Sequence, residues 1–151
     1  MRKFAKISAV LAAMVLAIAF VGCKDDDDDD DDPSVVTTWY TQEVDEDDDS
    51  VMTETIYFYD DSTFKVVDSS EGVNINFATG TYTGDTTKDG NIVITIKKIV
   101  KGVLDDSESL DLVDVPAEYA SYFVLKATIN GNTMSSIDGD GDGELSAWIK
   151  K

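Results

Sequence analysis

The feature that most constrains the fold of this chain is a repeated alternation of apolar and polar residues. In residues 53–59 (TETIYFY), Ile56 and Phe58 fall on one side of the alternation, and residues 91–98 (NIVITIKK) repeat the pattern with three isoleucines. Successive side chains of a β-strand point to opposite faces, so a period of two is typical of half-buried strands. The same pattern, rich in β-branched and aromatic residues, predicts strands in residues 63–67, 73–82, 122–130 and 145–151.

Two of these predicted strands assign particular residues to one face. Residues 73–82 are expected to align Val73, Ile75 and Phe77. Residues 145–151 are expected to align Leu145, Ala147 and Ile149, with Trp148 on the opposite face. Because the side-chain period of a strand is two, each alignment predicts which residues share a surface of the sheet.

Turn-forming residues separate the predicted strands. Asp, Gly, Asn and Ser concentrate between them, and Asn130-Gly131 is a strong hairpin signal. No long segment has a helical period; residues 115–122 are expected to form one helical turn, with Pro116 near its start. The pattern is least clear in residues 101–114, although residues 109–115 (SLDLVDV) are a further candidate strand.

These strands, eight or nine in number, predict an all-β fold. They follow one another through short turns, which is typical of an antiparallel meander. An open meander exposes two edges, whereas closure into a barrel removes them. We therefore expect a closed barrel, with an open β-sandwich of the same strands as the alternative.

Several short motifs resemble the lipocalin-like lipoprotein domains. They are Trp39 in an early strand, the spacing of Phe58, Asp61 and Phe64, and the segments 80–85 (GTYTGD) and 129–134 (INGNTM). The usual Gly-x-Trp opening is absent, since Thr37-Thr38 precedes Trp39. The resemblance covers most of residues 37–151 and implies a lipocalin-like barrel whose interior holds side chains or one small ligand. Four aromatic residues are candidates for lining such a pocket, or for plain core: Phe58, Phe64, Phe77 and Phe123.

The N-terminus predicts export. Residues 1–6 carry three basic residues, and the apolar run at 7–21 is shorter than the roughly 20 residues that span a membrane. Residues 20–23 (FVGC) resemble the end of a bacterial lipoprotein signal, which implies a signal peptide at 1–22, cleavage before Cys23, and lipidation of Cys23 by chains such as palmitate. Cys23 is the only cysteine, so no disulfide can form within the chain.

Eight consecutive aspartates, Asp25 to Asp32, follow this cysteine. Like charges repel, so residues 23–36 are expected to form an extended acidic linker that holds the domain away from the membrane. Cys23-Lys24-Asp25-Asp26 also resembles the acidic export signal of some bacterial lipoproteins, which implies an outer-membrane anchor with the domain facing outward. Either role, spacer alone or spacer with address, fits the residues.

Charge and composition exclude several functions. The net charge of −19 becomes −22 once residues 1–22, with three basic and no acidic residues, are removed. Such a chain is not expected to bind nucleic acid, and the lipid alone should attach it to the membrane. Without histidine, and with its cysteine lipidated, it is not expected to be an enzyme, although a two-carboxylate glycosidase is formally possible. We expect a monomer without a cofactor.

One acidic segment is a candidate calcium site. Asp138, Asp140, Asp142 and Glu144 stand in IDGDGDGELSAW, which resembles the first half of an EF-hand loop. Ile149 occupies the position of the usual bidentate glutamate, and strands rather than helices are expected on both sides. The alternatives are a weak calcium site and an acidic, glycine-rich hairpin loop.

Two functions remain open. The domain either binds a small apolar or amphipathic molecule inside the barrel, or it is an adhesion or envelope-interaction module with a filled barrel and functional loops. An internal cavity of about 300 Å³ or more would favour ligand binding.

Overall fold

The computed structural model describes residues 32–44, 49–137 and 145–151. Within these ranges the chain forms a single antiparallel sheet of nine strands. The strands are β1 (Val35–Val44), β2 (Val51–Tyr59), β3 (Thr63–Ser70), β4 (Val73–Thr83), β5 (Gly90–Val100), β6 (Leu112–Asp114), β7 (Val124–Asn130), β8 (Thr133–Ile137) and β9 (Leu145–Lys150).

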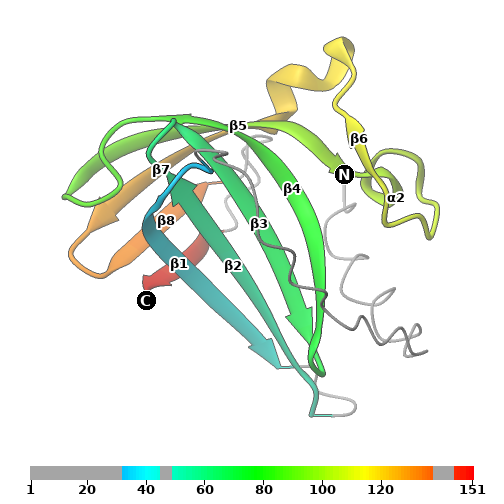
Figure 1. The fold of residues 1–151 in the computed structure, drawn as a ribbon, viewed down its shortest axis with the longest axis horizontal. Helices are drawn as coiled ribbons and strands as arrows, with labels where there is room; N and C mark the ends of the chain where they lie inside the picture. Colours follow the sequence, from blue (N-terminus) through cyan, green and yellow to red (C-terminus); the bar gives the residue numbers. More distant parts are fainter. Residues whose placement is uncertain (1–31, 45–48, 138–144) are drawn as a thin grey trace.

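Eight of these strands close into a barrel (Figure 1). β1 pairs with both β2 and β9, and β4 pairs with β5, so that the sheet curls until its two sides meet. The ninth strand, β6, pairs only with β5, beside the barrel wall. The predicted closed meander is therefore confirmed, and the open sandwich is not the observed arrangement.

The two ends of the barrel differ. One end, here named the hairpin end, carries the turn at residues 60–62, the loop at 84–89 and the turn at 131–132. At the other, the crossover end, the chain passes from β5 to β7 through α2 (Lys101–Asp105), β6 and the 3-10 helix η2 (Ala117–Phe123). η2 follows Pro116, so the helical turn expected there is confirmed.

The core lies in the barrel interior. Its largest fully buried side chains include Trp39, Phe58, Phe64 and Met134. The rings of Phe58 and Tyr82 meet edge to face, with centroids 4.8 Å apart. Burial of each large apolar side chain contributes about 1.5–3 kcal/mol, so these residues supply much of the stability. At the crossover end the core is continued by partly buried Val103, Leu104, Leu112 and Val115.

The predicted alternation of two strands is confirmed, except that an irregularity interrupts β4. In β9, Trp148 is buried, whereas Ala147 is exposed and Ile149 is 53% exposed. Trp148 therefore lies on the face opposite to Ala147 and Ile149, as expected, and its ring nitrogen has a partner inside the barrel. In β4, an irregularity pairs Val66 with Ala78 but Val67 with Asn76, so Phe77 has no direct partner and is only partly buried while Ala78 enters the core.

Close approach of two strands explains one glycine. A register irregularity between Thr79 and Gly80 brings β4 tightly against β5. A methyl group on Gly80 would collide with the carbonyl oxygen of Thr95 and would lie 2.9 Å from Cε1 of Phe64. Only glycine fits where the backbone of one strand comes this close to its neighbour.

Candidate functional site

Two carboxyl groups lie on the inner wall of the barrel. Glu54 on β2 is the register partner of Asp68 on β3. Glu54 belongs to the same face of β2 as the buried residues Ile56 and Phe58, and Asp68 belongs to the same face of β3 as Val66. Directly opposed residues in an antiparallel pair have Cβ atoms about 4.5–5.5 Å apart, so the two carboxyl groups are neighbours.

Glu54 accepts a hydrogen bond from a tryptophan on β9, a strand that is separated from β2 by β1. The indole Nε1 of Trp148 on β9 donates a hydrogen bond of 2.7 Å to Oε1 of Glu54. Burial raises the pKa of Glu54 above its ordinary value, and the nearby charge of Glu43 acts in the same direction. The hydrogen bond from Trp148 opposes this rise, because it favours the carboxylate.

Asp68 is less well satisfied. Its side chain is buried, with 7% exposed, and its Oδ1 has no hydrogen-bond partner among the residues that the structure describes. Burial raises the pKa of Asp68 to about 7, and the charges of Glu54 and Glu43 add to the rise. An unpartnered buried carboxylate is costly, so Asp68 is poised to hold a proton or to meet a ligand.

A hydroxyl group on β8 is also without a partner. Ser136 is 3% exposed, and its Oγ has no hydrogen-bond partner in the structure. It lies two residues after Met134, a core residue whose register partner is Trp148. Since residues i and i+2 of a strand share a face, Ser136 faces inward on the crossover-end side of Met134.

The barrel wall is incomplete beside these groups. β1 and β9 pair at only two positions, Trp39 with Lys150 and Tyr40 with Ile149. β1 continues to Val44 along β2, and Figure 1 shows β1 to β4 extending together past β9. The hydrogen bond from Trp148 to Glu54 therefore spans the place where the two strands separate.

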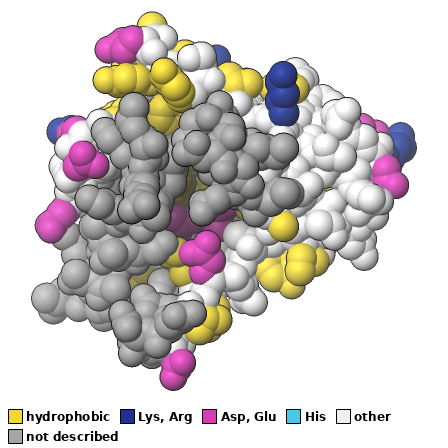
Figure 2. Space-filling view, turned by 180° about the vertical axis from the view of Figure 1, so that it is seen from behind, with side chains coloured by type: hydrophobic (Ala, Val, Ile, Leu, Met, Phe, Trp, Pro, Cys, Tyr) yellow, Lys and Arg dark blue, Asp and Glu magenta, His cyan; other side chains and the backbone are white. Residues whose placement is uncertain are grey.

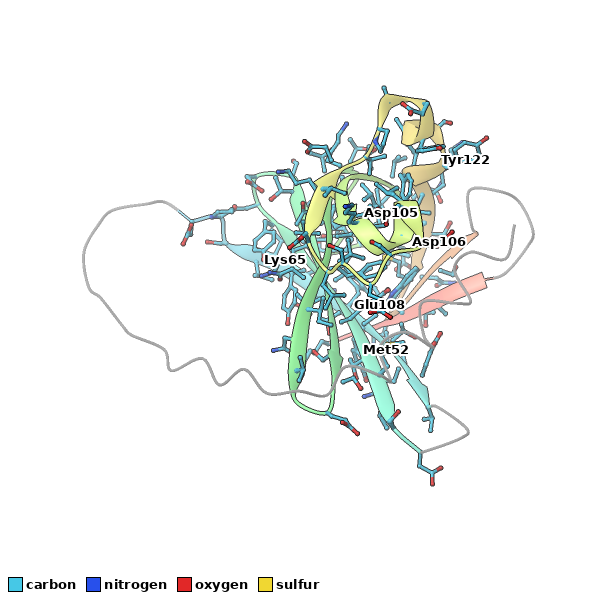
Figure 3. All side chains as sticks on the ribbon, turned by 90° about the vertical axis from the view of Figure 1, so that its right-hand side faces the viewer. Met52, Lys65, Asp105, Asp106, Glu108 and Tyr122 are labelled. Carbon is cyan, nitrogen blue, oxygen red and sulfur yellow. The ribbon has the colours of Figure 1, made fainter. Side chains whose placement is uncertain are left out.

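The crossover end is acidic. Figure 3 shows Asp105, Asp106 and Glu108 on the segment that follows β5. The ammonium group of Lys101 lies 3.7 Å from the carboxylate of Asp105, an exposed pair of small energetic value. In Figure 2, acidic side chains are visible near the middle of the face seen from behind. The field at this end favours cations.

A separate depression lies on the outside of the barrel. Its volume is about 380 Å³, and it is shallow and open. Its lining residues are Tyr59, Thr63, Phe64, Lys65, Thr79, Gly80, Thr81, Lys97 and Lys98. It lies over β3, β4 and β5, where the outward-facing register row joins Lys65, Thr79 and Lys98. This volume is not the internal cavity that would indicate a ligand-binding barrel.

The aromatic candidates from the sequence lie in or against the core. Phe58, Phe64 and Phe123 are buried members of the core cluster, and Phe77 is partly buried and packs against it. None of these four residues is a register partner of Glu54 or Asp68. Glu54 pairs with Thr41 on β1 and with Asp68 on β3, and Asp68 pairs with Ile75 on β4.

The other predicted site residues fall outside the described residues. These are Cys23, which was predicted to be lipidated, and the calcium candidates Asp138, Asp140, Asp142 and Glu144. In the part of the chain that the structure describes, no group of three or more acidic, His or Cys side chains is arranged to hold a metal ion.

The acidic pair was missed, although the sequence carries a signal for it. Glu54 falls in phase with Ile56 and Phe58, and Asp68 falls in phase with Phe64 and Val66. A carboxylate in the apolar phase of a predicted strand is expected to point into the core. Two such residues on consecutive strands are the pattern that would have indicated the site.

Comparison with known proteins adds no relative. No family model, no curated protein and no solved structure matches the chain. Among the described residues, no helix is long and apolar enough to cross a membrane.

Proposed function

We propose that this protein is a surface-anchored lipoprotein whose barrel binds a small amphipathic molecule through the site formed by Glu54, Asp68, Ser136 and Trp148. The observation that carries the proposal is that Asp68 Oδ1 and Ser136 Oγ are two of the three buried side-chain polar atoms without a hydrogen-bond partner among the described residues, the third being Trp39 Nε1. Buried polar atoms are almost always hydrogen-bonded, and those that are not deserve an explanation. A ligand with polar groups supplies the missing partners.

The surroundings fit an amphipathic ligand better than a purely polar one. Trp148 is buried beside Glu54, and Met134 and the core lie deeper in the barrel. An apolar wall with a few polar groups is the usual composition of a small-molecule site. The separation of β1 from β9 beyond Tyr40 and Ile149 is the proposed entrance.

The anchor rests on residues 20–32. The lipoprotein-like FVGC segment and the aspartate run that follows it support lipidation of Cys23, an outer-membrane location and display toward the exterior. Each buried CH₂ group of an acyl chain contributes about 0.8 kcal/mol to membrane binding, so several chains hold firmly. Cys23→Ala is expected to move the protein from the membrane fraction to the soluble fraction, and protease treatment of intact cells is expected to release the domain. Retention in the membrane, or protection until lysis, would contradict these two expectations respectively.

Ligand binding is tested by native mass spectrometry of protein purified from its own cells. We expect a bound mass of a few hundred daltons that is present in the natural chain and absent from Ser136→Trp, which fills the site. Ser135→Trp is the matched control, because the neighbouring residue faces the outer side of β8 and should leave the ligand in place. Protein without any bound mass, and without affinity for added amphiphiles, would contradict the proposal.

The second candidate is a non-enzymatic adhesion or envelope-interaction module. The observation that favours it is the filled half of the barrel, where Trp39, Phe58, Phe64 and Met134 are fully buried. In that case function resides on the loops, and Ser136→Trp should leave binding of cells or envelope unchanged. Loss of the adhesive activity on replacing exposed loop residues, with no small ligand found, would favour this candidate.

A further inference from the structure

The polar groups on the proposed binding wall share one sign of charge. Glu54 and Asp68 face the interior, and Glu43 acts on both through its charge. No lysine or arginine forms a salt bridge with any of these three among the described residues. Lys150, on β9, lies instead toward the hairpin end, with its ammonium group 5.9 Å from the ring of Trp39 and 3.5 Å from the carbonyl oxygen of Thr87.

Buried carboxylates without a cation are unfavourable. Transfer of a charge out of water is costly unless a partner of opposite sign is present. The free protein meets this cost by holding protons, since burial raises the pKa of Asp68 to about 7 and raises that of Glu54. Among the described residues, no positive group pairs with these carboxylates.

The geometry points to an amine-bearing organic molecule as the ligand, with its ammonium group bound by Glu54 and Asp68. This inference deepens the proposed function and rests on it. An ammonium group has three N–H donors, which suit Asp68 Oδ1, unpartnered among the described residues, and the carboxylate of its register partner Glu54. The apolar part of the ligand contacts Trp148 and the core behind it.

Proton balance follows directly. In the free protein near neutral pH, Asp68 is partly protonated. When R-NH₃⁺ binds, Asp68-COOH gives up its proton to the buffer, and the ammonium group takes its place beside the carboxylate. Among the described residues, the charged groups that act on Asp68 are Glu54 from β2 and Glu43 from β1, both acidic, so none of them is a cation that competes for the carboxylate.

An inorganic divalent cation is the competing occupant. Ca²⁺ requires about six to eight oxygen ligands, and Mg²⁺ requires a near-octahedral set. The described residues offer no cluster of three acidic groups for either ion. Trp148 beside the pair contributes an apolar surface, which suits the hydrocarbon part of an organic cation, and it supplies no oxygen ligand for a metal ion.

Three probes with the same chain and different head groups test the inference: octylammonium, octanol and octanoate. Titration calorimetry at about pH 8 measures their binding to the mature chain carrying Cys23→Ala. We expect octylammonium to bind at least tenfold more tightly than octanol, and octanoate to bind most weakly. The Glu54→Gln/Asp68→Asn double variant keeps the side-chain shapes, and we expect it to lose this preference while octanol binding persists.

General attraction to an acidic protein is controlled by a matched variant. Asp106→Asn/Glu108→Gln removes two charges from exposed positions at the same end of the barrel (Figure 3). We expect this variant to keep the preference for octylammonium to within about twofold. An equal loss in both double variants would show that only the overall field attracts the amine, and would overturn the inference.

The remaining outcomes separate this inference from the proposed function. If octanol or octanoate binds as tightly as octylammonium, the barrel binds small ligands but not through an ammonium group. If none of the three binds, both proposals fail. If equimolar Mg²⁺ or Ca²⁺ displaces octylammonium, the site holds an inorganic cation and the organic ligand is excluded.

Discussion

The indole Nε1 of Trp148 donates a 2.7 Å hydrogen bond to Oε1 of Glu54, although the two residues are 94 positions apart in the sequence. β9 and β2 are not neighbours in the sheet, since β1 lies between them. The bond therefore links two strands across the gap where β1 and β9 separate. It stabilises the ionised form of a carboxyl group that burial otherwise disfavours.

Removal of this donor should destabilise the protein most at high pH. In Trp148→Phe, Glu54 keeps its burial but loses its partner, so its pKa rises further. We expect the free energy of unfolding to fall by about 1–3 kcal/mol at pH 8 from the lost bond, in addition to the change in packing, and by less at pH 5. Urea denaturation at both pH values measures this. In a Glu54→Gln background the same substitution should show little pH dependence; an equal loss at both pH values in the natural background would contradict the account.

Asp68 should make the native state less stable as the pH rises. Its pKa is about 7 in the folded protein, against an ordinary value of 3.8. Between these values the folded state holds a proton that the unfolded state has released, so the free energy of unfolding falls as the pH increases from about 4 to 7. One pKa unit corresponds to about 1.4 kcal/mol, which sets an upper limit of about 4 kcal/mol for the whole effect.

Asp68→Asn should remove much of this dependence. The amide is uncharged at every pH, so we expect the variant to be more stable than the natural chain at pH 8, with the difference shrinking as the pH falls toward 4. Urea denaturation across this range is the measurement. Glu118→Gln, which removes one charge from an exposed position on η2, is the control for net charge and should leave the slope unchanged. A parallel slope in Asp68→Asn would refute the assignment.

Gly80→Ala should impair barrel closure. The added methyl group meets the Thr95 carbonyl and the Phe64 ring, and backbone must move to admit it. Overpacking typically costs about 1–3 kcal/mol, and a backbone clash belongs at the upper end or beyond. Thermal unfolding by circular dichroism checks this, with Thr81→Ala on the exposed side of the same strand as control. A melting temperature equal to that of Thr81→Ala would mean that β4 and β5 lie farther apart.

The acidic segment at 138–144 should respond to divalent ions through charge relief rather than through a specific site. Ile149 stands where a bidentate glutamate is needed, and Leu145–Lys150 is a strand. We expect Ca²⁺ and Mg²⁺ at equal concentration to raise the melting temperature equally, both in the natural chain and in Asp140→Ala. A rise specific to Ca²⁺ and abolished in Asp140→Ala would establish the calcium site instead.

The fold was predictable because its main signal is local. Alternation in residues 53–59 and 91–98 and hairpin chemistry at Asn130-Gly131 identify strands and turns without knowledge of the rest of the chain. Closure into a barrel was also predictable, because a long open meander would expose two unpaired edge strands. The candidate strand in residues 109–115 is confirmed by the short β6. α2 was not predicted, because a short element at the side of a barrel depends on contacts that the sequence does not display.

Two features could not be predicted from local sequence: which face of β9 points into the barrel, and which residues form the binding wall. Trp148 could be assigned to the interior only by knowing that Glu54 lies within its reach. The irregularity that moves Ala78 inward and leaves Phe77 unpaired is a property of the pairing between β3 and β4, not of β4 alone. Asp68 and Glu54 were missed for a simpler reason. The chain has 31 acidic residues, so two carboxylates in the apolar phase of predicted strands are a weak signal.

The short pairing of β1 with β9 also dictates an order of assembly. The contact of Trp39 with Lys150 has the largest sequence separation of any strand pairing in the barrel, so its loop-closure entropy is the highest and its formation the slowest. Hairpins such as β2–β3 and β7–β8 form between strands that are close in the sequence, and the pairing of β1 with β9 forms after them. Until Leu145–Lys150 has been synthesised and has reached β1, the emerging chain carries two unpaired strand edges, and a ribosome that stalls before this segment leaves a nascent polypeptide prone to aggregate.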